Sequence, residues 1–124
     1  MVAMTAFPAH GMELTHILVV AEIDRARSFY RDVLGAFGTW LLLVTGGGPT
    51  ADKPTVTFVP PADPDRVSHS MTIRVPDCRA AHETLVARGA VFLTEPVESD
   101  WEIRAFFRDP DGHLIEISEA KARS

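Results

Sequence analysis

The stretch Arg108–Ser118, RDPDGHLIEIS, joins a turn signal to a strand signal near the end of the chain. Asp109–Gly112 has Asp, Pro and Gly at positions that a type I turn favours, so it predicts a hairpin. The apolar run Leu114–Ile117 that follows contains a carboxylate, Glu116, and burying a charge without a partner is costly. Two explanations are open: an edge strand that shows one side to water, or an interior site that needs the charge.

The hairpin belongs to the second of two units that share one order of signals. The apolar run MELTHILVV contains His16, and the run VSHSMTIRV contains His69. His16 lies eight residues before Asp24, and His69 lies eight residues before Asp77. Each Asp is a candidate N-cap of an amphipathic helix that ends at a glycine. The repeat predicts a duplication of one strand–helix–strands unit, and because neither half can bury its sheet face alone, we expect the two sheets to pair.

The two units differ in their number of strands. Further strands are expected at 39–46 and 54–60 in the first unit, and at 90–96, 103–109 and 113–119 in the second. The first unit therefore lacks one strand, or the sequence lacks a segment there.

The composition, 46% hydrophobic and 23% charged over 124 residues, is that of one compact domain. We expect an N-terminal arm at 1–12 and one domain at 13–124, with a first module at about 13–62 and a second at about 66–119. The charge of −5 comes without a basic run, which excludes a nucleic-acid or anionic-membrane binder and favours small molecules or like chains as partners. The single cysteine, Cys78, and the lack of a signal peptide or an apolar span favour a cytoplasmic location.

Strand alternation assigns His16, His69 and Glu116 to faces of three corresponding strands. Taken singly, each histidine is more often a hydrogen-bonded core residue, and Glu116 is more often an exposed residue of an edge strand. The residues expected under the helices are Ile17, Val19, Ile115 and Ile117. The polar residues would then point together into the concavity of the sheet, where two imidazoles and one carboxylate form a ligand set used by catalytic zinc and by non-haem iron.

Three segments, LTHILVVAEIDRARSFYRDVLG, SHSMTIRVPD and FRDPDGHLIEI, resemble the vicinal oxygen chelate superfamily. That superfamily includes glyoxalase I, extradiol dioxygenases, fosfomycin-resistance thiol transferases and bleomycin-resistance proteins. The resemblance covers essentially the whole chain after Gly11 and implies an α+β fold of two paired βαβββ modules that form a curled mixed sheet around a cleft, usually in a homodimer. It also implies that the family's metal ligands fall on His16, His69 and Glu116.

Departures from the residue patterns of the family narrow the set of possible reactions. Glyoxalase I usually adds a fourth ligand from the last strand of the first module, where this chain offers Thr55 or Thr57. Extradiol dioxygenases usually carry a His and a Tyr before the final Asp-Pro turn, where this chain has Phe106 and Phe107. The fosfomycin enzymes place Lys, Arg and Tyr around the phosphonate, whereas the only tyrosine here, Tyr30, lies on the first helix. This chain therefore does not fully match the residue pattern of any of the three enzyme classes.

Five further residues are candidates for contact with a substrate, although core or surface roles are commoner for their types: Trp40, Met71, Trp101, Arg104 and Phe106. The prediction is a metal-dependent enzyme that acts on a small oxygenated metabolite, with glyoxalase-like lyase or isomerase chemistry favoured. A divalent ion (Zn, Mn, Ni, Fe or Co) would act as a Lewis acid, and Glu116 is a candidate catalytic base.

Two other functions are compatible with the same residues. One is a metal-free protein of the bleomycin-resistance type, which binds an antibiotic in an aromatic cleft. The other is a degenerate module that serves only in dimerisation, which the missing strand favours.

Overall fold

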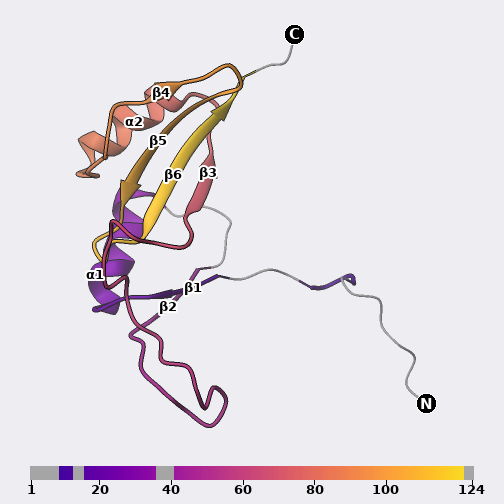
Figure 1. Ribbon diagram of the computed structural model, residues 1–124. Coiled ribbons are helices and arrows are strands. Elements are labelled where there is room, and N and C mark those ends of the chain that lie inside the picture. The colour runs from indigo at the N-terminus through magenta and orange to yellow at the C-terminus, as the bar shows by residue number, and fades with distance from the viewer. Residues whose placement is uncertain (1–8, 13–15, 36–40, 122–124) are drawn as a thin grey trace.

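The computed structural model describes residues 9–12, 16–35 and 41–121. Its elements are β1 (His16–Val19), α1 (Ile23–Ser28), the π-helical turn η1 (Phe29–Val33) that continues α1, β2 (Leu41–Val44), β3 (Met71–Arg74), α2 (Cys78–Ala87), β4 (Val97–Glu98), β5 (Glu102–Arg108) and β6 (Leu114–Ala120). Over these residues two α-helices and two sheets make a mixed fold (Figure 1), which confirms the predicted α+β class. Neither α-helix in these ranges is long and apolar enough to cross a membrane.

The larger sheet has four strands in the order β3-β6-β5-β4. Strand β6 is parallel to β3 and antiparallel to β5. The turn between β5 and β6 forms where the sequence predicts it, because the N–H of Gly112 donates to the carbonyl of Asp109 at 3.1 Å. The predicted hairpin is confirmed, and β6 is not an edge strand because it has a partner on each side.

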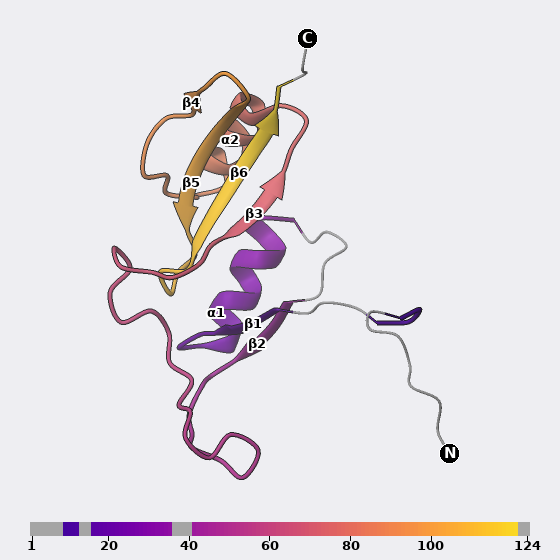
Figure 2. The ribbon, with the colours of Figure 1, turned by 45° about the vertical axis from the view of Figure 1, so that its right-hand side comes forward.

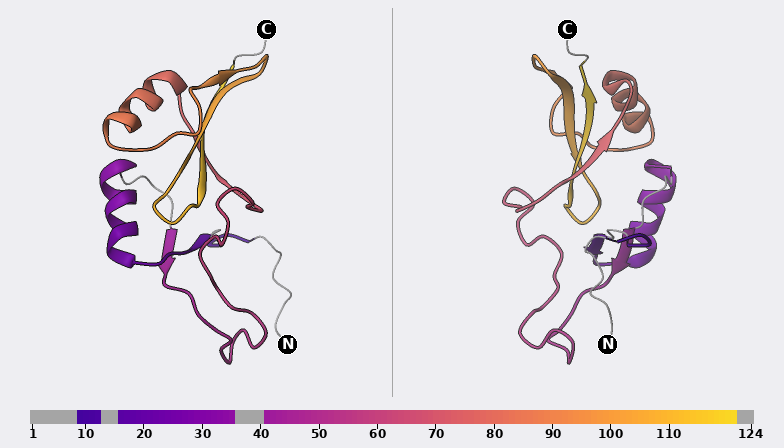
Figure 3. Two further views of the ribbon diagram at one scale, coloured as in Figure 1. Left: turned by 60° about the vertical axis from the view of Figure 1, so that its left-hand side comes forward. Right: turned by 90° about the vertical axis from the view of Figure 1, so that its right-hand side faces the viewer.

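One face of this sheet is covered by the helices, which lie on the same side of the strands (Figure 3). Leu85 of α2 and Phe29 of η1 belong to the buried cluster that contains Phe107, Ile115 and Ile117. The last three residues are at most 1% exposed. The prediction that Ile115 and Ile117 lie under the helices is confirmed, so Glu116, which alternates with them, faces the other way. We call this other side of the four-stranded sheet its open face.

The smaller sheet consists of β1 and β2, which run parallel, and it lies at the end of the four-stranded sheet where the β5–β6 turn is found (Figure 2). The face of this sheet that α1 covers carries Leu18 and Val20, which pack against Ala26 of α1. Leu18 is 1% exposed. The prediction that Ile17 and Val19 lie under the helices is wrong, since Ile17 is 45% exposed. Helix α1 instead packs on the alternate residues of β1, which are the face of His16.

The two predicted N-caps have different outcomes. Asp77 is confirmed, because its side chain accepts a hydrogen bond from the N–H of Ala80 at 3.0 Å. Asp24 is not a cap: the N-cap of α1 is Glu22, and its side chain makes no capping bond. Asp24 lies inside the first turn, where a carboxylate still favours the positive end of the helix dipole, and it pairs with Arg27 at 3.2 Å.

The strand predictions fail in two segments. Residues 54–60 are not a strand, and their link to the rest is an isolated bridge between Phe58 and Gly47. Residues 90–96 likewise supply one bridge, and the strand β4 follows them. Strand-forming residues need neighbours to pack against, and Val56 and Val59 are 47% and 61% exposed. In addition β3 begins at Met71, so His69 precedes the strand in which it was predicted.

The β5–β6 turn is tied to β1 and α1. The carboxylate of Asp109 accepts a hydrogen bond from the Tyr30 hydroxyl at 2.7 Å, and burial together with this carboxylate raises the pKa of Tyr30, so the hydroxyl keeps its proton. Asp111, with 2% of its side chain exposed, pairs with Arg25 at 2.7 Å. The Nε2 of His113 lies 2.7 Å from a β1 carbonyl, which can only accept. Through these contacts the turn joins the two halves of the chain.

Candidate functional site

Two of the predicted ligands lie together. His16 begins β1 and His69 lies shortly before β3, and the centroids of their rings are 5.2 Å apart. Burial, followed by repulsion from His69 and His113, lowers the pKa of His16 below its ordinary value. A neutral imidazole is the form that binds metal ions, so this environment favours a ligand role for His16.

The Nε2 atom of His16 is buried and has no hydrogen-bond partner among the residues that the structure describes. An orphaned nitrogen of this kind costs free energy unless something binds to it. A divalent cation supported by a second imidazole would satisfy the atom, and His69 is the imidazole in contact. The histidine pair therefore fits a metal ion.

Cavities adjoin both imidazoles. His16 lines one of about 260 Å³, whose other walls are largely apolar and include Tyr30, Met71 and Ile115. His69 lines a smaller one of about 160 Å³ together with His113. The predicted substrate residue Met71 is thus beside the His16 imidazole, on the helix-covered side of the sheet.

Glu116 lies on the open face, and its charge has partners there. Its Oε1 accepts a hydrogen bond from Thr72 at 2.8 Å, and its Oε2 lies 3.6 Å from a guanidinium nitrogen of Arg104. With 11% of the side chain exposed, this is an interior carboxylate of a central strand. Of the two explanations for a charge inside LIEI, the interior position is therefore the one that the fold adopts.

The third ligand does not join the histidine pair within one chain. Over residues 9–12, 16–35 and 41–121, no three side chains of His, Cys, Asp or Glu are grouped so that they could hold a metal ion. Glu116 is kept apart from the histidine pair because the side chains point to different sides. His16 of β1 points to the side that α1 covers, whereas Glu116 of β6 points to the open face of the four-stranded sheet.

The other predicted substrate residues are dispersed. Arg104 and Phe106 lie on the open face, with the guanidinium 5.5 Å from the centre of the phenyl ring. Trp101 is 70% exposed in the turn before β5. Trp40 lies outside the described residues. Arg104 and Phe106 are thus the predicted substrate residues that neighbour Glu116.

Sequence reasoning missed the polar residues that surround Glu116. Thr72 pairs with Glu116 in the register of β3 and β6, and Arg74 pairs with Ser118. The Ser118 hydroxyl, which is fully buried, accepts from Arg74 at 3.0 Å and donates to Glu102 at 2.8 Å. The alternation of Thr72 and Arg74 with apolar neighbours in MTIRV was the signal that could have placed them beside Glu116.

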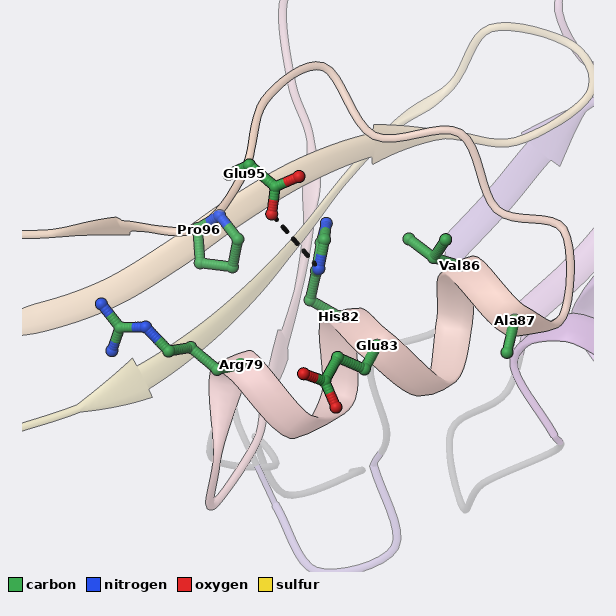
Figure 4. A pocket seen from close by; sticks show the side chains of 7 residues that line it. All are labelled: Arg79, His82, Glu83, Val86, Ala87, Glu95 and Pro96. Carbon is green, nitrogen blue, oxygen red and sulfur yellow. Dashed lines mark ion pairs between the residues drawn. The ribbon is translucent and has the colours of Figure 1, made fainter.

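A groove of about 460 Å³ lies between α2 and the segment Glu95–Pro96 (Figure 4). Nδ1 of His82 lies 3.9 Å from Glu95 across it, and Arg79 at its end pairs with Glu98 at 3.5 Å. The His82 ring also packs on Phe92, with 4.4 Å between the centroids. These contacts hold the segment before β4 against the helix, so the groove has a structural explanation.

Comparison with known proteins identifies the class. Residues 13–117 match the model of the Glyoxalase/Bleomycin resistance protein/Dioxygenase superfamily, so the chain belongs to this superfamily. The resemblance found in the sequence is confirmed.

Individual relatives differ in their described roles. A lactoylglutathione lyase from Haemophilus influenzae is 31% identical over 133 residues, which covers 90% of this chain and 95% of the relative. A protein of the mobile metagenome of V. pseudocholerae is 25% identical, with a TM-score of 0.68 and coverage of 94% of this chain and 100% of that one. The antibiotic-binding protein TnmS3 from Streptomyces sp. CB03234 is 18% identical, with a TM-score of 0.62 and coverage of 91% and 100%, which shows a common fold.

The alignment with the lyase also bears on the length of the chain. It runs over 133 positions, more than the 124 residues present here, so the relative carries residues within the matched region that this chain lacks.

Proposed function

We propose that the protein is a metal-dependent enzyme that acts on a small oxygenated metabolite by lyase or isomerase chemistry of the glyoxalase type. The observation that carries the proposal is the contact of His16 with His69, together with the buried Nε2 of His16, which has no hydrogen-bond partner in the described part of the chain. The 31% identity to a lactoylglutathione lyase over nearly the full length of both chains supports the same chemistry. The metal would be Zn, Mn, Ni, Fe or Co, which are ions that a mixed set of imidazole and carboxylate ligands can bind.

The proposed ligands are His16 and His69 of one copy and Glu116 of a second copy, in a homodimer of paired βαβββ modules. Support comes from the separation of Glu116 from the histidine pair within one chain. It also comes from the β1–β2 sheet, since a two-stranded sheet is marginal alone and its outer face exposes Ile17 and Leu42, which are register partners. A second copy would cover this face.

Each side chain has a defined part in the proposed chemistry. When bound, a divalent ion supplies Lewis acidity that stabilises negative charge on vicinal oxygens of the substrate. Glu116 is the proposed base, and its carboxylate is oriented by the Thr72 hydroxyl and by Arg104. Phe106, in register with Glu116 on the neighbouring strand, offers an apolar surface for the carbon skeleton of the substrate.

The first experiment measures metal content. Protein purified without chelator is expected to hold a divalent ion, and His69→Ala is expected to lose it while the circular dichroism spectrum is retained. His82→Ala is the matched control, because His82 lies on α2 beside Phe92 and should leave the metal content unchanged. Retention of the full metal content by His69→Ala would overturn the ligand assignment.

The second experiment asks which copies form the site. His69→Ala and Glu116→Ala are each expected to bind little metal alone, whereas a mixture that has exchanged subunits should recover binding. Recovery is expected because a mixed dimer then contains one site with both histidines from one chain and an intact Glu116 from the other. If the mixture recovers nothing, the ligands do not come from two copies.

A second candidate function is a metal-free antibiotic-binding protein. The observation in its favour is that no three-ligand group forms within the described part of one chain, while Phe106 presents a ring on the open face. The likeness to TnmS3 supplies the fold for such a role. Wild-type protein without affinity for any of the five ions would favour this function over the enzyme.

A further inference from the structure

The open face of the four-stranded sheet carries two neighbouring rows of side chains that are defined by strand register. Thr72, Glu116 and Phe106 form one row across β3, β6 and β5. Arg74, Ser118 and Arg104 form the next row across the same strands. Two guanidinium groups therefore flank a buried serine, one row away from the proposed base.

Arg74 is a cation without an acidic partner in the part of the chain that the structure describes. No carboxylate lies within 4.0 Å of it among the residues that the structure describes, and the residue is exposed. Its Nη1 donates to the hydroxyl of Ser118 at 3.0 Å, and Ser118 is 0% exposed. The guanidinium is thus held at one nitrogen by a buried group, and its remaining N–H donors are available to a ligand.

Arg104 is only partly neutralised. Its Nη1 lies 3.3 Å from Glu102 and 3.6 Å from Glu116, both longer than a short charge-assisted hydrogen bond. The same nitrogen makes both contacts, and 52% of the side chain is exposed. Glu102 also accepts from Ser118 at 2.8 Å, so one network connects the two arginines through Ser118.

We propose that Arg74 and Arg104 form a carboxylate-binding site, so that the ligand of the open face is a small organic acid. Two forked donors on either side of Ser118 match the planar geometry of a carboxylate. This inference rests on the proposed function, in which the site anchors one end of the substrate. Because adjacent rows on one face are about 6.7 Å apart, the carboxylate lies several bonds from the oxygenated carbon that faces Glu116.

The test measures the dissociation constants of straight-chain monocarboxylates, from acetate to hexanoate, against those of their neutral primary amides. At low salt the wild type should bind the best acid at least about tenfold more tightly than its amide, since the amide lacks the charge. Arg74→Gln and Arg104→Gln should each reduce this preference, and the double variant should abolish it. Arg79→Gln is the matched control, because Arg79 lies on α2 on the other side of the sheet and pairs with Glu98.

Two results would overturn the carboxylate site: equal binding of acids and amides by the wild type, or an undiminished preference in the double variant. Metal content is measured on the same samples and should be unchanged in Arg74→Gln, because Arg74 contacts Ser118 and not the proposed ligand Glu116. If the wild type prefers carboxylates but holds no metal, the proposed metal-dependent enzyme is contradicted and the carboxylate site is supported. If it holds metal but shows no preference for carboxylates, the carboxylate site is contradicted and the proposed enzyme is supported.

Discussion

The two halves of the chain differ in how much apolar surface they bury. The second half, from β3 to β6, places Phe107, Ile115 and Ile117 in one cluster beneath α2, each at most 1% exposed. In the first half, from β1 to β2, the buried cluster consists of Leu18, Val20 and Ala26. The smaller half contacts the larger one through Phe29 of η1, which packs in the larger cluster, and through the β5–β6 turn, whose Asp109 and Asp111 bind η1 and α1 respectively. A unit with fewer strands is thus stabilised by its counterpart.

Phe107→Ala should have the largest effect on stability. Phe107 lies on β5, is 0% exposed, and belongs to the cluster that also contains residues of η1 and β6. Removal of a fully buried phenyl ring costs about 3–5 kcal/mol. Urea denaturation should show a single transition with this loss. A loss below about 1 kcal/mol would mean that the cluster of the second half is not the main core.

Leu18→Ala sharpens the contrast by testing the smaller cluster. Leu18 is 1% exposed, yet its cluster has few members and can collapse into the space left, so we expect the lower part of the usual range, about 2–3 kcal/mol. The same denaturation measurement applies, with Ile17→Ala as control because Ile17 is 45% exposed. An Ile17 variant that loses as much as the Leu18 variant would contradict the assignment of faces on β1.

Tyr30→Phe tests the connection between the halves. The substitution removes the hydroxyl that donates to Asp109 at 2.7 Å and leaves the ring in place. Hydrogen bonds to charged groups contribute about 1.5–3 kcal/mol, and partial burial favours the lower figure. Hydrogen exchange should then increase in β1 and α1 more than in β5 and β6. Equal increases in both halves would show that the bond does not act at the junction.

Asp77→Ala should have the smallest of the four effects, a loss of about 1 kcal/mol, because it removes the side chain that caps α2. Asp24→Ala is the matched control at the equivalent position of the first half. Asp24 caps nothing and is exposed, so its loss should be clearly smaller in thermal denaturation. Equal losses would restore the symmetry that the sequence suggested.

The sequence was informative where the signal is local. Asp77 and the Asp109–Gly112 turn act on backbone groups within four residues, and both predictions are confirmed. Asp24 shows the limit, because the same residue inside the first turn of a helix gives the same sequence pattern without capping the helix. Residues 54–60 show another limit, since strand propensity has no effect without a neighbouring strand.

The site depended on information that a single strand does not carry. The alternation of side chains along a strand predicts that His16 and Leu18 share a face. It does not predict that α1 covers this face and leaves Ile17 exposed. The contact of His16 with His69 joins segments that are far apart in the sequence, and the separate position of Glu116 follows from the packing of the sheets. The arginine row required the register of three strands, which only the fold supplies.

The β5–β6 turn has a consequence for protein engineering. Hairpin tips are ordinarily good places to insert a tag or a new terminus, because few contacts cross them. Here the tip carries the carboxylates that hold Tyr30 and Arg25, so lengthening it would break contacts that hold β1 and α1 to the four-stranded sheet. The connection from β2 to β3, which loops away from that sheet in Figure 2, is the better point of insertion.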